Sequence, residues 1–109
     1  MNIPPGAAIP EEKLTRYLLV PRDVDDKSKF LAQAEFTEEN PDDLMAAIRQ
    51  LTGSVDAVED GSNPFGDFYR VEGEIEGPNG RRLAVVLIWL RWYLDESFHF
   101  VTLKPWKGS

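Results

Sequence analysis

One apolar run near the C-terminal end decides the fold: Leu83-Ala84-Val85-Val86-Leu87-Ile88-Trp89-Leu90. Eight residues are too few to span a bilayer as a helix, which needs about twenty. A short run of this kind is typical of a buried strand. Both faces of the strand are apolar as far as Leu90. The sequence therefore predicts a central strand over residues 82–93, covered by helices on at least one face.

Period-two patterns lie on both sides of this run and predict two further strands. Residues 68–76 alternate between apolar and charged side chains, as expected for a half-buried strand. The sequence Gly77-Pro78-Asn79-Gly80 that follows is typical of a hairpin turn. After a second turn at residues 95–97, the alternation resumes. It places one set of residues, Phe98, Phe100 and Thr102, opposite a second set, His99, Val101 and Leu103.

Helical patterns occupy the first half of the chain. Residues 10–20 begin with proline and two glutamates, which favour a helix start, and Pro21 ends the segment. A second short helix is expected over residues 27–34. The third, over residues 41–53, carries apolar residues at the i, i+3, i+4 and i+7 spacing: Leu44, Ala47, Ile48 and Leu51. Residues 54–66, rich in Gly, Ser, Asn and Asp, are expected to be a linker.

This order of elements predicts an α+β domain in which two to three N-terminal helices pack on one face of a three-stranded antiparallel meander sheet. Residues 1–8 are expected to form a flexible lead-in, and residues 9–106 a single α+β domain. The N-terminus lacks the basic and apolar regions of a signal peptide, and cysteine is absent. A cytoplasmic location is therefore expected.

The charge distribution bears on the class of partner. The net charge is −7, with seven Lys/Arg against seventeen Asp/Glu in residues 1–80 and five against two in residues 81–109. The acidic part repels nucleic acid at long range, whereas the C-terminal part can attract an anion. Because nucleic-acid-binding proteins are usually basic, the overall balance counts against that class.

Several kinds of chemistry lack the residues they need. The absence of cysteine removes thiolate metal sites and cysteine nucleophiles, and a single histidine does not support a transition-metal site. The alternating Glu72, Glu74 and Glu76 are more typical of a solvated charged face than of a cation site. Neither a phosphate-binding loop nor a nucleophile elbow is present. No metal and no cofactor are expected.

Cationic and polar residues form the strongest constellation: Lys27, Lys29, Arg82, Arg91, His99 and Thr102. They lie on elements that can converge on one sheet face. Metal-free RNA cleavage needs a base for the 2′-hydroxyl proton, a cation beside the phosphorane and an acid for the leaving oxygen. Histidine titrates in the right range for either proton role. The competing interpretation is that the lysines coat a helix, Arg91 pairs with an acid and His99 lines a strand.

An ordered set of short motifs carries a family resemblance over about residues 9–106: Glu12-Lys13-Leu14, Tyr17-Leu18-Leu19, Lys27-Ser28-Lys29-Phe30, Pro64-Phe65-Gly66, Tyr69, Gly77-Pro78-Asn79-Gly80-Arg81, Trp89, Val101-Thr102 and Pro105. The set resembles an uncharacterised family of small bacterial domains. These domains occur alone, often beside a tiny partner gene, or at the C-terminus of phage-head and polymorphic-toxin proteins. The order of helices followed by a meander is also similar to the RelE–barnase group of ribonuclease toxins.

The resemblance implies two functions. In the first, the chain is a toxin-like, metal-independent ribonuclease of a toxin–antitoxin or phage module. His99 is then acid or base, Lys29 and Arg82 bind phosphate, Thr102 positions the substrate, and Lys27 and Arg91 are further ligand-binding residues. In the second, the chain is a non-catalytic acidic interaction protein of the antitoxin or immunity type. A small protein encoded nearby is the expected partner, RNA is a partner that the net charge disfavours, and no membrane partner is expected.

Overall fold

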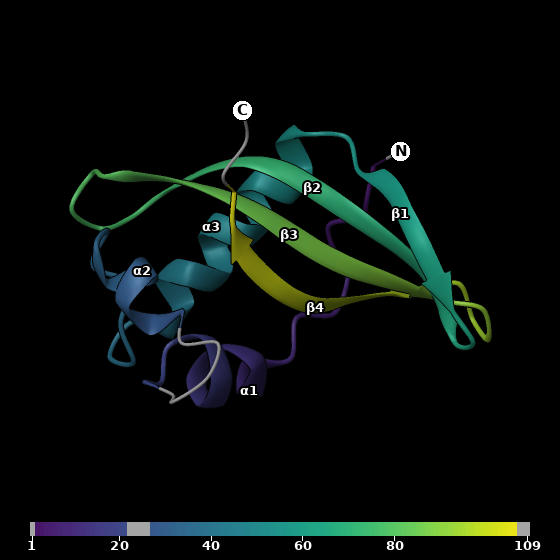
Figure 1. Ribbon diagram of the computed structural model, residues 1–109, viewed down its shortest axis with the longest axis horizontal. Coiled ribbons are helices and arrows are strands. Elements are labelled where there is room, and N and C mark those ends of the chain that lie inside the picture. Colours follow the sequence, from purple (N-terminus) through teal and green to yellow (C-terminus); the bar gives the residue numbers. More distant parts are fainter. Residues whose placement is uncertain (1, 22–26, 107–109) are drawn as a thin grey trace.

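The computed structural model describes residues 2–21 and 27–106, and they form helices followed by strands (Figure 1). The helical elements are α1 Glu11–Lys13, its π-helical continuation η1 Leu14–Leu18, α2 Ser28–Ala32 and α3 Pro41–Ser54. The strands are β1 Val58–Asn63, β2 Gly66–Glu76, β3 Arg82–Trp92 and β4 Phe98–Pro105. The predicted α+β class is confirmed. Within the described residues, no helix is long and apolar enough to cross a membrane.

The sheet is an antiparallel meander with the strand order β1-β2-β3-β4. It has four strands, so the prediction of three was wrong, because β1 lies in residues expected to be a linker. Every residue of β1 except Asn63 is exposed, so the strand has no apolar alternation from which it could be recognised. Its position is set by pairing with β2, from Val58 opposite Arg70 to Asn63 opposite Gly66.

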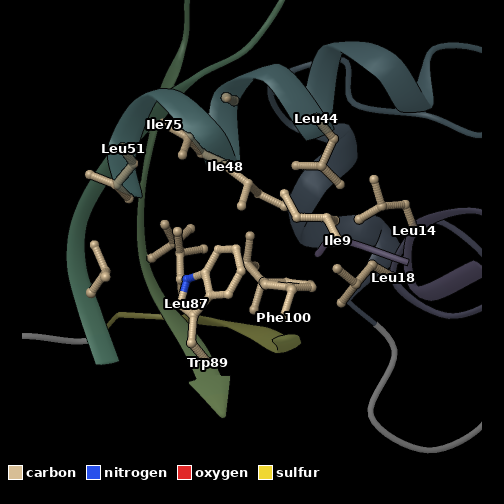
Figure 2. Packing of buried hydrophobic residues seen from close by; sticks show 14 of the residues in the cluster. Ile9, Leu14, Leu18, Leu44, Ile48, Leu51, Ile75, Leu87, Trp89 and Phe100 are labelled. Carbon is tan, nitrogen blue, oxygen red and sulfur yellow. The ribbon is translucent and has the colours of Figure 1, made fainter. Parts of the chain in front are cut away.

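The helices cover one face of the sheet and enclose the core (Figures 1 and 2). In α3, the four predicted apolar residues are all buried. Beneath them lie Leu87 and Trp89 of β3, which are 0% and 1% exposed. Trp89 meets Phe100 of β4 edge to face, with ring centroids 5.6 Å apart. Burial alternates along β3, so Val86, Ile88 and their neighbours on the other face of the sheet, called here the outer face, are only half-buried.

The turn between β2 and β3 is fixed against the residues that follow α2. A side chain at Gly77 would place its Cβ 2.0 Å from the carbonyl oxygen of Ala34, so only glycine fits this contact. The Asn79 side-chain amide also donates to the carbonyl of Gln33 at 3.1 Å. The predicted hairpin turn is confirmed, with Gly80 N–H donating to the carbonyl of Gly77 at 2.9 Å.

A β-bulge interrupts the alternation of β4. Trp89 lies opposite Phe100 and Ile88 lies opposite Thr102, so Val101 is the extra residue. The bulge returns Leu103 to the core, where it is 0% exposed, and places Thr102 on the outer face with His99. The prediction that Thr102 shares a face with Phe98 and Phe100 was therefore wrong, because strict alternation takes no account of a bulge.

The segment before α1 lies along β4, the strand at one edge of the sheet. Ala8 N–H donates to the carbonyl of Phe98 at 3.1 Å, and Phe100 N–H donates to the carbonyl of Ala8 at 2.9 Å. Ile3 and Ala7 are buried. Residues 1–8 were expected to be flexible. These contacts do not measure motion, so the expectation stays a prediction.

Candidate functional site

The bulge brings two of the predicted site residues together on the outer face. His99 lies opposite Leu90, and Thr102 lies opposite Ile88, two residues earlier on β3. At about 3.4 Å per residue, the two positions are separated by about 7 Å along the sheet. Both side chains are half-buried. His99 and Thr102 are thus neighbours on one open surface, at a spacing that one phosphodiester link of RNA can cover.

A groove of about 900 Å³ separates β4 from the first helical segment. It is called here the cationic groove and is lined by Pro10, Glu12, Lys13, Tyr17, Lys27, Val101, Thr102, Lys104 and Pro105. Three of these side chains are lysines and one is a glutamate, in a chain whose net charge is −7. The cationic groove is therefore a local reversal of the charge of the protein, and its chemistry suits an anion.

Lys27 is the central cation of the cationic groove. Its Nζ donates to Oγ1 of Thr102 at 2.9 Å and lies 5.4 Å from the centre of the Tyr17 ring. The hydrogen bond joins residues 75 positions apart in the sequence and directs the ammonium group toward β4. Because an ammonium group has three donors, Lys27 can hold Thr102 and still donate to a phosphate oxygen.

His99 is held on two sides. Its ring stacks on Trp92 with centroids 4.0 Å apart and an interplanar angle of 20°. Its Nε2 lies 2.8 Å from Oγ of Ser97. Ser97 Oγ in turn donates to Oδ1 of Asp95 at 2.6 Å, and Ser97 N–H donates to the same oxygen at 3.0 Å. The hydrogen bonds from Ser97 lower the pKa of Asp95 below its ordinary value.

The remaining predicted cations lie apart from this pair. Arg82 lies beside Glu76, with Nε 3.6 Å from a carboxylate oxygen, near the C-terminal part of α3. Arg91 donates to Glu96 at 2.7 Å, as the competing interpretation of the sequence expected. Lys29 lines a different groove, which also contains Glu38 and Glu39. The structure therefore places His99 near Thr102 on one sheet face and Lys27 in contact with Thr102, whereas Lys29, Arg82 and Arg91 lie elsewhere. The predicted roles of all six residues stay predictions.

Three residues of the cationic groove were missed by the sequence analysis: Lys13, Tyr17 and Lys104. Lys104 lies opposite Val86, on the same outer face as Thr102, so the corrected alternation of β4 would have identified it. Lys13 and Tyr17 lie on α1 and η1. No local pattern distinguishes them from ordinary surface and packing residues, because their role depends on where the helix docks.

The tips of two hairpins lie side by side at the other end of the sheet (Figure 1), and their side chains form an apolar patch. This hairpin-tip patch consists of Phe65, Leu90, Trp92 and Leu94, around a hollow of about 380 Å³. Phe65 is 73% exposed and Leu94 is 89% exposed. The tips are joined by Tyr93, whose N–H donates to the carbonyl of Phe65 at 2.9 Å and whose hydroxyl donates to Asp67 at 2.8 Å. Trp92 and Trp106 are also exposed, at 39% and 40%.

The described residues contain no group of three His, Asp or Glu side chains that could hold a metal ion. Two of the three glutamates of β2 instead lie beside arginines. Glu72 lies 3.5 Å from Nε of Arg70, and Glu76 lies beside Arg82. The chemistry that the site offers is therefore that of one imidazole, one hydroxyl and a set of ammonium groups.

Comparisons with known proteins agree with the fold. Among the solved structures, one chain of the "Contact-dependent growth inhibition toxin - immunity protein complex from Klebsiella pneumoniae 342" is similar, with a TM-score of 0.63 and 18% identity over 94% of this chain and 96% of that chain. No curated protein matches the sequence. A profile of the family described as "Domain of unknown function (DUF6883)" matches residues 5–107, close to the range over which the motifs show their resemblance. This match spans nearly the whole sequence, and the chain therefore belongs to the DUF6883 family.

Proposed function

We propose that this domain is a toxin-like ribonuclease that cleaves RNA without a metal ion, at a site formed by His99 and the cationic groove. One observation carries the proposal: His99 shares the outer face of β3 and β4 with Thr102, which Lys27 contacts. A group able to exchange a proton thus lies about 7 Å along the sheet from the threonine that holds a cation able to bind a phosphate. The similarity to one chain of a toxin–immunity complex supports a place in a toxin–immunity pair, as the toxin or as the immunity protein.

The proposed reaction is an internal transfer at phosphorus. His99 takes the proton of a ribose 2′-hydroxyl, the 2′-oxygen forms a bond to phosphorus, and the bond from phosphorus to the 5′-oxygen breaks. Lys27 stabilises the negative charge that develops on the phosphorane, and Thr102 holds Lys27 in place. The leaving 5′-oxygen takes a proton from water in the open groove. The products are a 2′,3′-cyclic phosphate end and a 5′-hydroxyl end.

The experiment compares purified wild-type protein with His99→Gln on a single-stranded RNA oligomer, in the presence and absence of EDTA. We expect cleavage by the wild type that EDTA leaves unchanged, with cyclic phosphate ends. Loss of the proton acceptor should lower the rate of the variant about 10²- to 10⁴-fold. Circular dichroism and thermal unfolding establish that the variant is folded. Equal cleavage by a folded His99→Gln variant, or no cleavage by the wild type, would overturn the proposal.

A second function, an interaction protein of the antitoxin or immunity type, is favoured by the hairpin-tip patch. Its two most exposed side chains, Phe65 and Leu94, are rare on a free surface, and carboxylates lie close to them in the sequence at Asp67, Asp95 and Glu96. An acidic chain with such a patch suits a basic partner that presents an apolar side chain. In that case the wild type does not cleave RNA. Phe65→Ser then weakens its binding to the small protein encoded beside its gene, measured by calorimetry at low salt.

A further inference from the structure

The three polar residues at the turn between β3 and β4 form a continuous chain of hydrogen bonds that ends on the only histidine of the sequence. Asp95 Oδ1 accepts from both the hydroxyl and the N–H of Ser97, at 2.6 and 3.0 Å. Ser97 Oγ lies 2.8 Å from Nε2 of His99. Asp95 and Ser97 are not groove residues, and the mechanism described above makes no use of them.

The direction of these bonds determines which nitrogen of His99 carries a proton. A serine hydroxyl has one hydrogen, and in this chain of bonds it is donated to the carboxylate of Asp95. The oxygen of Ser97 can then only accept, so Nε2 of His99 must be the donor. In the neutral ring, a proton on Nε2 leaves the lone pair on Nδ1. Among the described residues, no hydrogen bond to Nδ1 occupies that lone pair.

Stacking restricts the same ring in a second way. Trp92 lies against His99 with centroids 4.0 Å apart and planes 20° from parallel, so the imidazole cannot rotate out of its plane without losing this contact. Trp92 is itself fixed in the turn, because its N–H donates to the carbonyl of Ser97 at 2.9 Å and its carbonyl accepts from Glu96 N–H at 2.8 Å. Ring orientation and tautomer are thus set by residues of one turn.

We propose that Asp95 and Ser97 are positioning residues that hold His99 as the Nε2–H tautomer and leave Nδ1 as its proton-accepting atom. The catalytic use of Nδ1 rests on the proposed ribonuclease function, whereas the tautomer itself does not. The arrangement matches a general pattern in which the hydrogen bond to one imidazole nitrogen determines the role of the other.

The presence of a single histidine makes the tautomer directly measurable. In uniformly ¹⁵N-labelled protein, long-range ¹H–¹⁵N spectra of the neutral ring show which nitrogen is protonated, with no overlap from a second histidine. We expect the Nε2–H form to predominate in the wild type. Ser97→Ala should give a mixture of tautomers, and Ser97→Thr, which keeps the hydroxyl, should restore the wild-type signal.

Ser54→Ala is the matched control, because Ser54 also donates a hydroxyl hydrogen bond, to the carbonyl of Gln50 at the end of α3. It should leave the His99 spectrum unchanged, and thermal unfolding of all variants establishes folding. A wild-type ring protonated on Nδ1, or a folded Ser97→Ala variant with the wild-type tautomer, would overturn the proposal.

RNA cleavage gives the second readout. Loss of one positioning hydrogen bond should lower kcat of Ser97→Ala about three- to tenfold while KM stays constant, with recovery in Ser97→Thr. If the tautomer responds as expected but the wild type does not cleave RNA, the positioning of His99 stands and the ribonuclease function fails. If cleavage depends on His99 but the tautomer does not depend on Ser97, the ribonuclease function stands and the positioning role fails.

Discussion

The two sides of the outer sheet face use cationic residues differently. On β2 and at the start of β3, Arg70 donates to Asp60 at 2.9 Å, and Arg82 lies 3.6 Å from Glu76. On the β4 side, Lys27 donates to the hydroxyl of Thr102. Within residues 2–21 and 27–106, the ion pairs all involve arginines and none involves a lysine. The difference teaches that an acidic protein can still gather cations in one groove, because ion pairing within the described residues is confined to the arginines.

The sharpest test of this difference compares two lysines. Lys27 lies in the cationic groove, whereas Lys29 lies two residues away and lines a groove that contains Glu38 and Glu39. The probe is a single-stranded oligonucleotide with 2′-deoxy sugars, which cannot be cleaved because it lacks the attacking 2′-hydroxyl. We expect Lys27→Ala to weaken its binding about ten- to a hundredfold, since hydrogen bonds to charged groups are strong. Lys29→Ala should change affinity less than about threefold. Fluorescence anisotropy measures both, and equal losses would remove the distinction between the two lysines.

A smaller effect is expected on the opposite side of the sheet. The side chains of Arg82 and Glu76 are 67% and 61% exposed, and exposed ion pairs contribute about 0.2–1 kcal/mol. Arg82→Ala should therefore lower the free energy of unfolding by less than about 1 kcal/mol in urea titrations and leave RNA affinity unchanged. A loss of affinity as large as that of Lys27→Ala would instead support the phosphate-binding role that the sequence analysis gave to Arg82.

The smallest effect concerns the two hairpin tips, which are joined by the hydrogen bond from Tyr93 to Asp67. The hydrogen bond to Asp67 raises the pKa of Tyr93 above its ordinary value of 10.0. This bond contributes stability that is fully present below the unfolded pKa and is lost as pH rises through the folded pKa. Asp67→Ala should shift the Tyr93 titration back toward its ordinary range. Phenolate absorbance, with Tyr93→Phe as the reference, measures the shift, and identical curves would show that the tips are not joined in solution.

Several predictions from the sequence agree with the structure because they rest on local patterns. The helix at residues 41–53 and the Gly77–Gly80 turn were recognised from spacing and turn residues, and both are present. Strand β1 was missed because its exposed polar residues carry no pattern of their own. The proximity of His99 to Thr102 was not predicted, because it depends on a bulge at Val101 that strict alternation does not predict.

The sequence by itself determined the α+β order, the buried face of α3 and the central position of β3, since apolar periodicity follows directly from which residues must leave water. Only the tertiary structure decided which cations line the cationic groove and, among the described residues, which form ion pairs. Lys27 and Thr102 are 75 residues apart, so their contact depends on how the first helical segments dock against β4. Charges act through distance in space rather than along the chain, and the composition of the chain does not contain that distance.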